Sequence, residues 1–306
     1  MRNGILNIYK EKGYTSHDVV AKLRGIVKQR KIGHTGTLDP QAEGVLPVCL
    51  GMATRLCDFL TEQRKTYETI LLLGKATDTQ DLEGTTLSVQ ETGFLTEAHV
   101  RACVEGYVGD YEQLPPMYSA LKVNGKKLYE LARAGVEVER KRRKVKIHAI
   151  QIQKMALPRV QMEVCCSKGT YIRTLCHDIG ESLGCGGCME SLLRTQVGRF
   201  WVKDSVRLAE IEELEKAGRL EEILLPVDQI FAELPAVAVE GKLQEMAYNG
   251  NPLPAEQIKS TLPLQFSLQQ VRVYDSGRRF IGVFRYDVQR NLFVVEKMFL
   301  DRDNLM

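Results

Sequence analysis

The 306-residue sequence lacks a strong charge of one sign and a long apolar run. Its 42 Lys and Arg residues nearly balance 39 Asp and Glu, which leaves a formal net charge of +3. So small a total does not argue for a nucleic-acid partner, because affinity depends on where the charges lie. No apolar run approaches the ~20 residues of a membrane span. We therefore expect a soluble protein, long enough for one large domain and one small one.

A recognisable signal peptide and a complete metal-binding motif are also missing. The eight cysteines are therefore expected to be reduced thiols in a cytoplasmic protein rather than a disulfide framework. Cys185 and Cys188 have CxxC spacing, but no second pair of Cys or His completes a zinc site. We expect no bound metal. The cysteines that lie among apolar residues are expected to be small buried hydrophobes: Cys49, Cys57, Cys103 and Cys176.

The most informative segment is a glycine-punctuated turn, Gly33–Pro40, with the sequence GHTGTLDP. Gly33 and Gly36 allow backbone angles and close approaches that a Cβ would forbid. Pro40 fixes φ immediately after the carboxylate of Asp39. The turn therefore presents one acidic side chain rigidly on a loop. An Asx turn, in which Asp39 bonds its own backbone, is the alternative and is commoner for an isolated Leu-Asp-Pro.

Helices and strands are interspersed in the first three quarters of the chain, without regular βαβ repetition. Ser16 is expected to cap a helix with Val19, Val20, Leu23, Ile26 and Val27 at helical spacing. Two further helices are predicted at 53–60, with Leu56, Phe59 and Leu60 inward, and at 170–183. Strands are predicted at 66–73, 145–152 and 160–166, the last with alternating apolar residues. This arrangement favours an α+β fold with a mixed sheet.

The composition changes near Pro226-Val227-Asp228. Beyond this point we expect a short helix around 242–248, a turn at 249–252 and strands near 270–275, 279–287 and 291–299. A segment of this size with several strands is small but able to fold alone. The sequence therefore predicts a second, mostly β domain over about 233–306.

The positive charge is unevenly distributed. The densest basic run is Arg140–Lys146, and Arg278-Arg279 forms a smaller cluster. A solvated surface segment is the ordinary interpretation of such a run, and contact with phosphates is the alternative.

The turn and the residues after it, through Arg55, closely resemble the catalytic motif of the bacterial tRNA pseudouridine-55 synthases, the TruB family. In that family the aspartate of G-H-T-G-x-L-D-P is the nucleophile. Other family motifs follow in the same order over roughly residues 4–228. The segments of this chain that resemble these motifs are Lys10 with Gly13, Ser16 and Asp18; Lys65-Thr66-Tyr67; Gly74 with Thr77–Asp81; Pro115–Ala120 with Lys122 and Gly125; Gly169–Arg173; and Leu192 with Arg194, Thr195 and Gly198.

This resemblance implies a mixed-sheet catalytic domain at 1–232, with a thumb-like insertion at about 112–146 and a PUA-like RNA-binding domain at 233–306. It implies isomerisation of uridine-55 in the T loop of tRNA, on a base flipped out of the RNA. Asp39 is then the nucleophile, Arg173 pairs with it and lowers its pKa, and Tyr67 stacks on the uracil. The reaction involves no redox step and transfers no chemical group from a second molecule, so no cofactor is expected.

The same resemblance implies substrate contacts for a further set of residues. His34 is the expected wedge that fills the space of the flipped base, and Tyr171 and Leu192 are expected to wall the pocket. The remaining predicted substrate-binding residues are basic: Lys10, Lys65, Arg55 and Arg194. The expected partner is tRNA, through its T arm and its acceptor end, with no membrane and no obligate protein partner.

Three positions depart from the family pattern: Glu11 replaces a proline, Cys188 a histidine and Leu193 an arginine. None of them belongs to the predicted catalytic set. Two alternative functions stay open at this point. One is a guide-RNA-dependent pseudouridylase that needs partner proteins, and the other is an RNA chaperone without catalysis.

Overall fold

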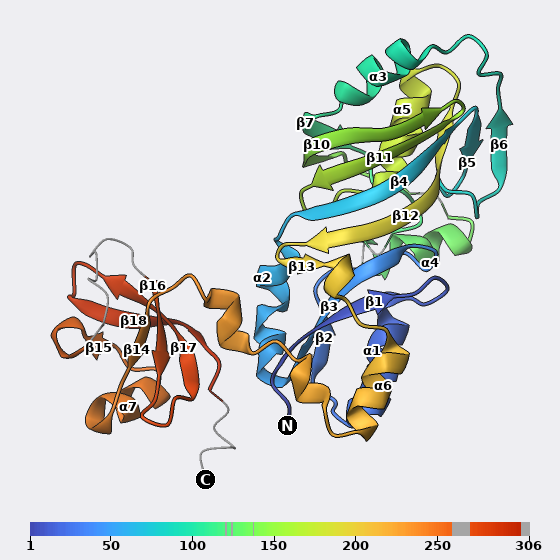
Figure 1. The fold of residues 1–306 in the computed structure, drawn as a ribbon. Helices are drawn as coiled ribbons and strands as arrows, with labels where there is room; N and C mark the ends of the chain where they lie inside the picture. The colour runs from blue at the N-terminus through green and yellow to red at the C-terminus, as the bar shows by residue number, and fades with distance from the viewer. Residues whose placement is uncertain (120, 124, 137, 259–269, 301–306) are drawn as a thin grey trace.

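The computed structural model describes residues 1–119, 121–123, 125–136, 138–258 and 270–300. Within these ranges nine strands form one mixed sheet in the order β1-β3-β12-β4-β11-β10-β7, with β2 on β3 and β13 on β12 (Figure 1). Only the β3–β12 pair is parallel among them. The strands are β1 Gly4–Lys10, β2 Ile32–His34, β3 Glu43–Leu50, β4 Lys65–Leu73, β7 Gly109–Gln113, β10 Arg143–Ala156, β11 Arg159–Cys166, β12 Gly187–Val197 and β13 Phe200–Trp201. The predicted α+β class is confirmed.

The sheet carries one apolar core in each half. In the half formed by β4, β10 and β11, helices α3 (Glu97–Glu105) and α5 (Ile172–Ser182) pack on one face. The buried side chains of β4 alternate with half-exposed ones, as period-2 burial requires. In the other half, α1 (Ser16–Val27) and α6 (Leu208–Lys216) cover β1 and β3. The parallel β3–β12 pair joins the halves, so the loop before β3 lies where the two halves meet.

Most predicted elements agree with the structure to within a few residues, but four details of the prediction were wrong. The cap of α1 is Thr15, whose hydroxyl accepts a hydrogen bond from the Asp18 amide. The helix predicted at 53–60 is a 3₁₀ helix, η1 (Gly51–Leu56), followed by α2 (Cys57–Thr61). Phe59 points outward and is 42% exposed. Cys57 and Cys103 are also half-buried rather than buried.

Residues 114–142 leave the sheet and return to it, because Gln113 of β7 pairs with Arg143 of β10. This excursion contains β8 (Lys122–Val123), β9 (Lys126–Lys127) and α4 (Leu128–Arg133). Ala120, part of the Pro-Pro-Met-Tyr-Ser-Ala motif, lies outside the described residues. A second excursion, between β5 (Lys75–Thr77) and β6 (Thr86–Val89), carries Asp81.

The C-terminal part has its own five-stranded sheet, in the order β14-β16-β17-β18-β15. Its elements are β14 Ala236–Ala238, α7 Gly241–Tyr248, β15 Leu253–Pro254, β16 Gln270–Tyr274, β17 Phe280–Asp287 and β18 Leu292–Met298. The remaining 3₁₀ helices of the described chain are η2 Val202–Asp204, η3 Leu220–Glu222, η4 Val227–Phe231 and η5 Ala255–Gln257. Residues 259–269 and 301–306 of the predicted second domain lie outside the described residues. The buried apolar residues of this C-terminal part form a core of their own.

An aromatic cluster joins the C-terminal sheet to the rest of the molecule. The Phe231 ring lies 5.9 Å from Phe59 and 5.8 Å from Phe299, and Phe280 stacks on Phe299 at 5.6 Å. The rings of Phe231, Phe280 and Phe299 contact one another, and such aromatic packing favours a fixed arrangement. The C-terminal sheet is therefore held in a defined position beside α2.

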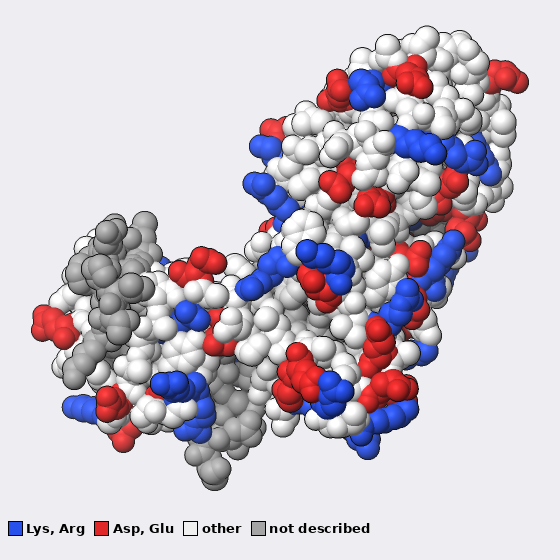
Figure 2. Space-filling view, in the orientation of Figure 1, with Lys and Arg blue, Asp and Glu red and all other residues white. Residues whose placement is uncertain are grey.

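Surface charge on the face seen in Figure 1 is mixed, with blue and red side chains interspersed (Figure 2). This agrees with the small net charge. Across the described ranges, none of the helices has both the length and the apolar character needed to cross a membrane.

Candidate active site

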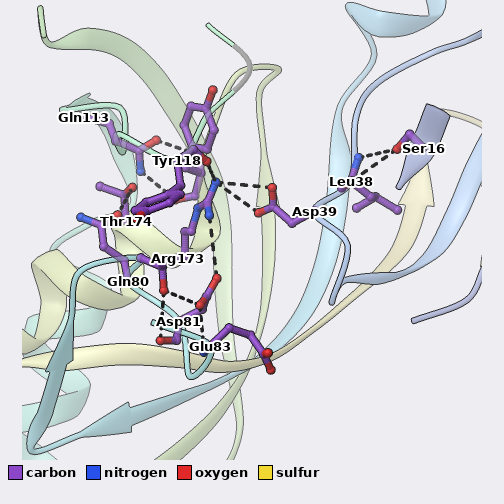
Figure 3. Close-up of polar contacts among 12 residues, drawn as sticks. Ser16, Leu38, Asp39, Gln80, Asp81, Glu83, Gln113, Tyr118, Arg173 and Thr174 are labelled. Atoms are coloured by element: carbon purple, nitrogen blue, oxygen red, sulfur yellow. Dashed lines mark hydrogen bonds and ion pairs between the residues drawn. The ribbon is translucent and has the colours of Figure 1, made fainter. Parts of the chain in front are cut away.

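Asp39 lies on the loop between β2 and β3, and buried polar groups brace the loop on both sides of it. The Ser16 hydroxyl accepts a hydrogen bond from the Leu38 amide at 2.9 Å and donates to the Leu38 carbonyl at 3.4 Å (Figure 3). The Lys10 ammonium donates to the carbonyls of Ala42 at 2.5 Å and Pro40 at 3.1 Å. The backbone before and after Asp39 is therefore fixed, as the glycine and proline pattern predicts.

Arg194 braces the same loop from β12. Its Nε donates to the Val45 carbonyl at 2.7 Å and its Nη2 to the Gly36 carbonyl at 3.2 Å. Gly44 allows the close contact of β3 with β12, since a Cβ there would lie 2.2 Å from the Arg194 carbonyl oxygen. The Asp39 loop thus receives hydrogen bonds from Lys10 of β1 and from Arg194 of β12.

Arg173 faces Asp39 from the first turn of α5 (Figure 3). Its Nη2 lies 3.4 Å from both carboxylate oxygens of Asp39 and donates to the Tyr118 carbonyl at 2.5 Å. Its Nη1 lies 3.8 Å from an oxygen of Asp81. The Arg173 side chain is only 5% exposed. One buried guanidinium therefore joins two carboxylates and a loop carbonyl.

Arg173 lowers the pKa of Asp39 as predicted, but the net effect on this pKa is a rise. Burial raises the pKa of Asp39 above its ordinary value, and the neighbouring charge of Asp81 adds to this, while Arg173 and Lys10 lower it. Burial is the largest of these effects, although the Asp39 side chain stays 34% exposed. The sequence identified the ion pair correctly but not the balance of the two effects.

Asp39 opens onto a groove of ≈ 270 Å³. Its walls include Leu192, predicted to be a pocket residue, together with Thr69, Ile70 and Met189. Besides Asp39, the groove is lined by several carboxylates: Glu43, Glu68, Asp81, Glu83 and Glu190. An acidic lining repels phosphates but admits an uncharged ring. Tyr67, Tyr171 and Arg173 are not among the described residues that line this groove.

Three other predicted site residues lie around this loop. Tyr67 is 8% exposed on β4, opposite Arg194 of β12, and burial raises the pKa of its phenol. Tyr171 is half-buried directly before α5, with the Arg173 guanidinium 5.8 Å from its ring centre. His34 is half-buried on β2, where burial and the charge of Arg194 lower its pKa. Neutral imidazole and protonated phenol are thus the favoured forms near neutral pH.

The four basic residues predicted to bind substrate have protein partners in this structure. Lys10 and Arg194 are 0% and 1% exposed and bond loop carbonyls, as described above. Lys65 is 5% exposed, and its ammonium donates to the carbonyls of Gln63 and Thr61. Arg55 donates to the Met298 carbonyl of the C-terminal sheet at 2.5 Å. Lys10, Lys65 and Arg194 thus support the protein backbone here. Burial of the two lysine side chains lowers the pKa of each to about 8.

Two residues at the site received no role from the sequence. Asp81 lies in a matched motif, but only the fold brings it to Arg173. Gln113 is 1% exposed and bonds the backbone of Tyr171. A glutamine at the end of a short strand carries no local signal of such a contact.

Comparison with known proteins establishes the family. The N-terminal domain of the TruB family pseudouridylate synthases matches residues 24–172, and the C-terminal domain of tRNA pseudouridylate synthase B matches 173–232. A curated relative from Lachnoclostridium phytofermentans, named tRNA pseudouridine synthase B, is 53% identical over 307 residues, which cover 97% of this chain and 100% of the relative. This chain belongs to the TruB family of pseudouridylate synthases. The resemblance inferred from the sequence motifs is confirmed.

Other members and solved structures agree with this assignment. A Clostridium perfringens protein of the same name is 42% identical, over 98% of this chain and 99% of its own length. A chain in the crystal structure of a Cbf5-Nop10-Gar1 complex is 26% identical with a TM-score of 0.71, over 98% of this chain and 86% of that one. A chain of an H/ACA RNP bound to a substrate RNA containing 2'-deoxyuridine, 24% identical with a TM-score of 0.70, has the same fold. The TruB fold thus extends over nearly the whole chain.

Proposed function

We propose that this chain isomerises uridine-55 in the T loop of tRNA to pseudouridine, with Asp39 as the covalent nucleophile. Family membership supports pseudouridine synthesis, and the names of the curated relatives support tRNA as the substrate. The observation that carries the residue assignment is the braced Asp39 loop, whose carboxylate is paired with Arg173 and opens onto the groove.

The chemistry requires one carboxylate and a site that holds a neutral ring. The N1–C1′ bond of uridine breaks, the uracil turns, and C5 bonds to C1′, while the C5 proton leaves and N1 gains a proton. A covalent bond to Asp39 can hold the intermediate during this rotation. Arg173 keeps the carboxylate oriented and favours its ionised form. The acidic lining of the groove beside Asp39 should keep the phosphates of the RNA out of it.

The uridine must leave the folded RNA loop before it reaches Asp39. We propose that His34, at the start of the Asp39 loop, fills the vacated space. Its lowered pKa favours the neutral ring, which can stack between bases. Tyr67 and Tyr171 are proposed to contact the flipped uracil. Two further parts of the chain are proposed to bind the tRNA. Residues 112–146 would act as a thumb against the T arm, and residues 233–306 as a PUA-like domain at the acceptor end. We propose a cytoplasmic enzyme that needs no obligate protein partner.

A tritium-release assay tests this function. The substrate is a T-arm stem-loop with [5-³H]uridine, and the control is the same stem-loop with cytidine at position 55. The proposal predicts release from the uridine RNA by the protein alone and none from position 55 of the control. Activity only with a guide RNA and partner proteins would indicate the guide-dependent alternative. Tight binding without release would indicate an RNA chaperone.

Tyr67→Phe separates two roles of this ring. The variant keeps the stacking face, so RNA affinity should stay near that of the wild type. If the hydroxyl takes part in proton transfer, the single-turnover rate should fall by about 10²–10⁴-fold. Rapid-quench measurements on the stem-loop, with Tyr67→Ala as the variant that loses both roles, give the answer. A wild-type rate for Tyr67→Phe would leave Tyr67 as a stacking platform only.

The basic run at the base of the proposed thumb should contribute salt-dependent affinity. Arg143 is exposed, and Arg142 is exposed even though it donates to the Glu112 carbonyl at 3.0 Å. Changing both to Gln should flatten the slope of log affinity against log salt by about 0.7–0.9 per lost phosphate contact. The single-turnover rate at saturating RNA should hardly change. Lys154→Gln, at the exposed far end of β10, is the control. An unchanged slope in the double variant would identify the run as a solvated surface.

A further inference from the structure

The amide of Gln113 forms a closed pair of hydrogen bonds with one backbone residue. The Tyr171 amide donates to Gln113 Oε1 at 2.8 Å, and Gln113 Nε2 donates to the Tyr171 carbonyl at 2.9 Å (Figure 3). Gln113 is 1% exposed, so both bonds lie out of water. Removal of the Gln113 amide would take away the acceptor of the Tyr171 amide, and an unsatisfied buried donor is costly.

This pair is made at the residue where α5 begins. Tyr171 occupies the N-cap position and makes no side-chain capping bond. Its carbonyl also accepts the Leu175 amide at 3.1 Å, within the first turn of the helix. Gln113 thus fixes both polar groups of the residue from which the helix starts. Arg173 lies two residues farther along the same turn.

Gln113 is connected to Arg173 by a second route. It is the last residue of β7 and opens the excursion 114–142. Five residues later, the Tyr118 carbonyl accepts a hydrogen bond from Arg173 Nη2 at 2.5 Å. The guanidinium is therefore held between the helix start that Gln113 clamps and a loop segment that begins directly after Gln113.

The guanidinium itself has little else to set its direction. Its Nε is buried and has no hydrogen-bond partner among the described residues. Its contact with Asp81 is longer, at 3.8 Å. The 3.4 Å pair with Asp39 therefore depends on the start of α5 and on the bond to the Tyr118 carbonyl.

We infer that Gln113 is a positioning residue for catalysis, which sets the Arg173–Asp39 pair by clamping the first residue of α5. The inference rests on the proposed role of Asp39. A glutamine is required because the clamp needs one donor and one acceptor on the same planar group. Methionine has a similar length without either. An ionised glutamate has two acceptors and would face the Tyr171 carbonyl with the wrong polarity.

The first test compares the single-turnover rate with the RNA affinity in Gln113→Met. The rate should fall by about 10²-fold, as for a misplacement of ~1 Å at the reacting groups, while the affinity stays near wild type. Gln196→Met is the matched control. Its Nε2 donates to the Gly198 carbonyl at 2.7 Å in the same sheet, away from α5. The control should keep the wild-type rate.

The pH dependence gives a sharper criterion. Arg173 lowers the pKa of Asp39, so a displaced Arg173 should move the acidic limb of the rate to higher pH. The activity of Gln113→Met relative to wild type should therefore decline as the pH falls. In Gln113→Glu it should rise as the pH falls, because a protonated carboxyl offers one donor and one acceptor and restores the clamp. This variant keeps the test available if Gln113→Met unfolds.

A measurement without turnover separates this inference from the proposed function. The ¹³C signal of the Asp39 carboxyl, assigned by its loss in Asp39→Asn, should titrate at higher pH in Gln113→Met than in the wild type. An inactive wild type would refute the proposed function but leave this comparison intact. Wild-type rates and an unshifted Asp39 titration in both Gln113 variants would overturn the inference.

Discussion

Asp39→Asn is expected to abolish turnover while T-arm binding stays near that of the wild type. The substitution is nearly isosteric and removes the nucleophile, and loss of a nucleophile in other covalent enzymes costs about 10⁶-fold in rate. The bracing contacts of the loop use the backbone around Asp39, so they should survive. Rapid-quench tritium release and filter binding on the same stem-loop measure the two quantities. Equal losses of binding and activity would assign Asp39 a folding role instead.

The stability of the same variant relative to the wild type should change with pH. The folded-state pKa of Asp39 is raised, chiefly by burial. The folded protein therefore binds this proton more tightly than the unfolded chain, and stability is lost as the pH rises from the ordinary Asp pKa through the raised one. Asparagine does not titrate. The difference in melting temperature, Asp39→Asn minus wild type, should grow across that window and then level off, and a difference that shrinks would contradict the raised pKa.

Arg173→Lys should have the second largest effect, a loss of about 10²–10³-fold in single-turnover rate. The guanidinium reaches both oxygens of Asp39, the Tyr118 carbonyl and Asp81 at once. A single ammonium on a flexible stem cannot reproduce this planar arrangement. The residual activity should also require a higher pH, because Arg173 opposes the effect of burial on the pKa of Asp39.

The matched control for this variant is Arg219→Lys. Arg219 pairs with Glu222 on the surface through a similar two-bond contact, far along the chain from the site. It should keep the wild-type rate and pH profile. A wild-type rate for Arg173→Lys would show that charge alone, rather than the geometry of the guanidinium, supports Asp39.

The sequence predicted the strands well because apolar residues alternate with polar ones where one sheet face is buried, as in β4 and β11. The turn chemistry of Gly36 and Pro40 indicated that Asp39 is held rigidly on a loop, and only the family resemblance gave Asp39 a role. The capping residue of α1 was wrong for a tertiary reason. Two hydroxyl residues are adjacent, and Ser16 instead holds the Leu38 backbone, which leaves Thr15 to cap the helix.

Other features could not be predicted because they depend on burial or on contacts far apart in sequence. The sequence pattern around a lysine or arginine does not distinguish one that contacts RNA from one that bonds a backbone carbonyl. Only the fold shows that Lys10 and Arg194 are buried. The direction of the Asp39 pKa shift depends on the balance between burial and an ion pair. Gln113 and Tyr171 are 58 residues apart, so neither local pattern indicates their contact.

The most direct test of the account maps the modified position in a full-length tRNA transcript. Wild type and Asp39→Asn are incubated with the RNA at concentrations that give equal occupancy, and pseudouridine is located by carbodiimide modification and reverse transcription. The proposed function predicts a single new stop that reports position 55 with the wild type and none with Asp39→Asn. Pseudouridine at another position, or an undiminished product with Asp39→Asn, would contradict it.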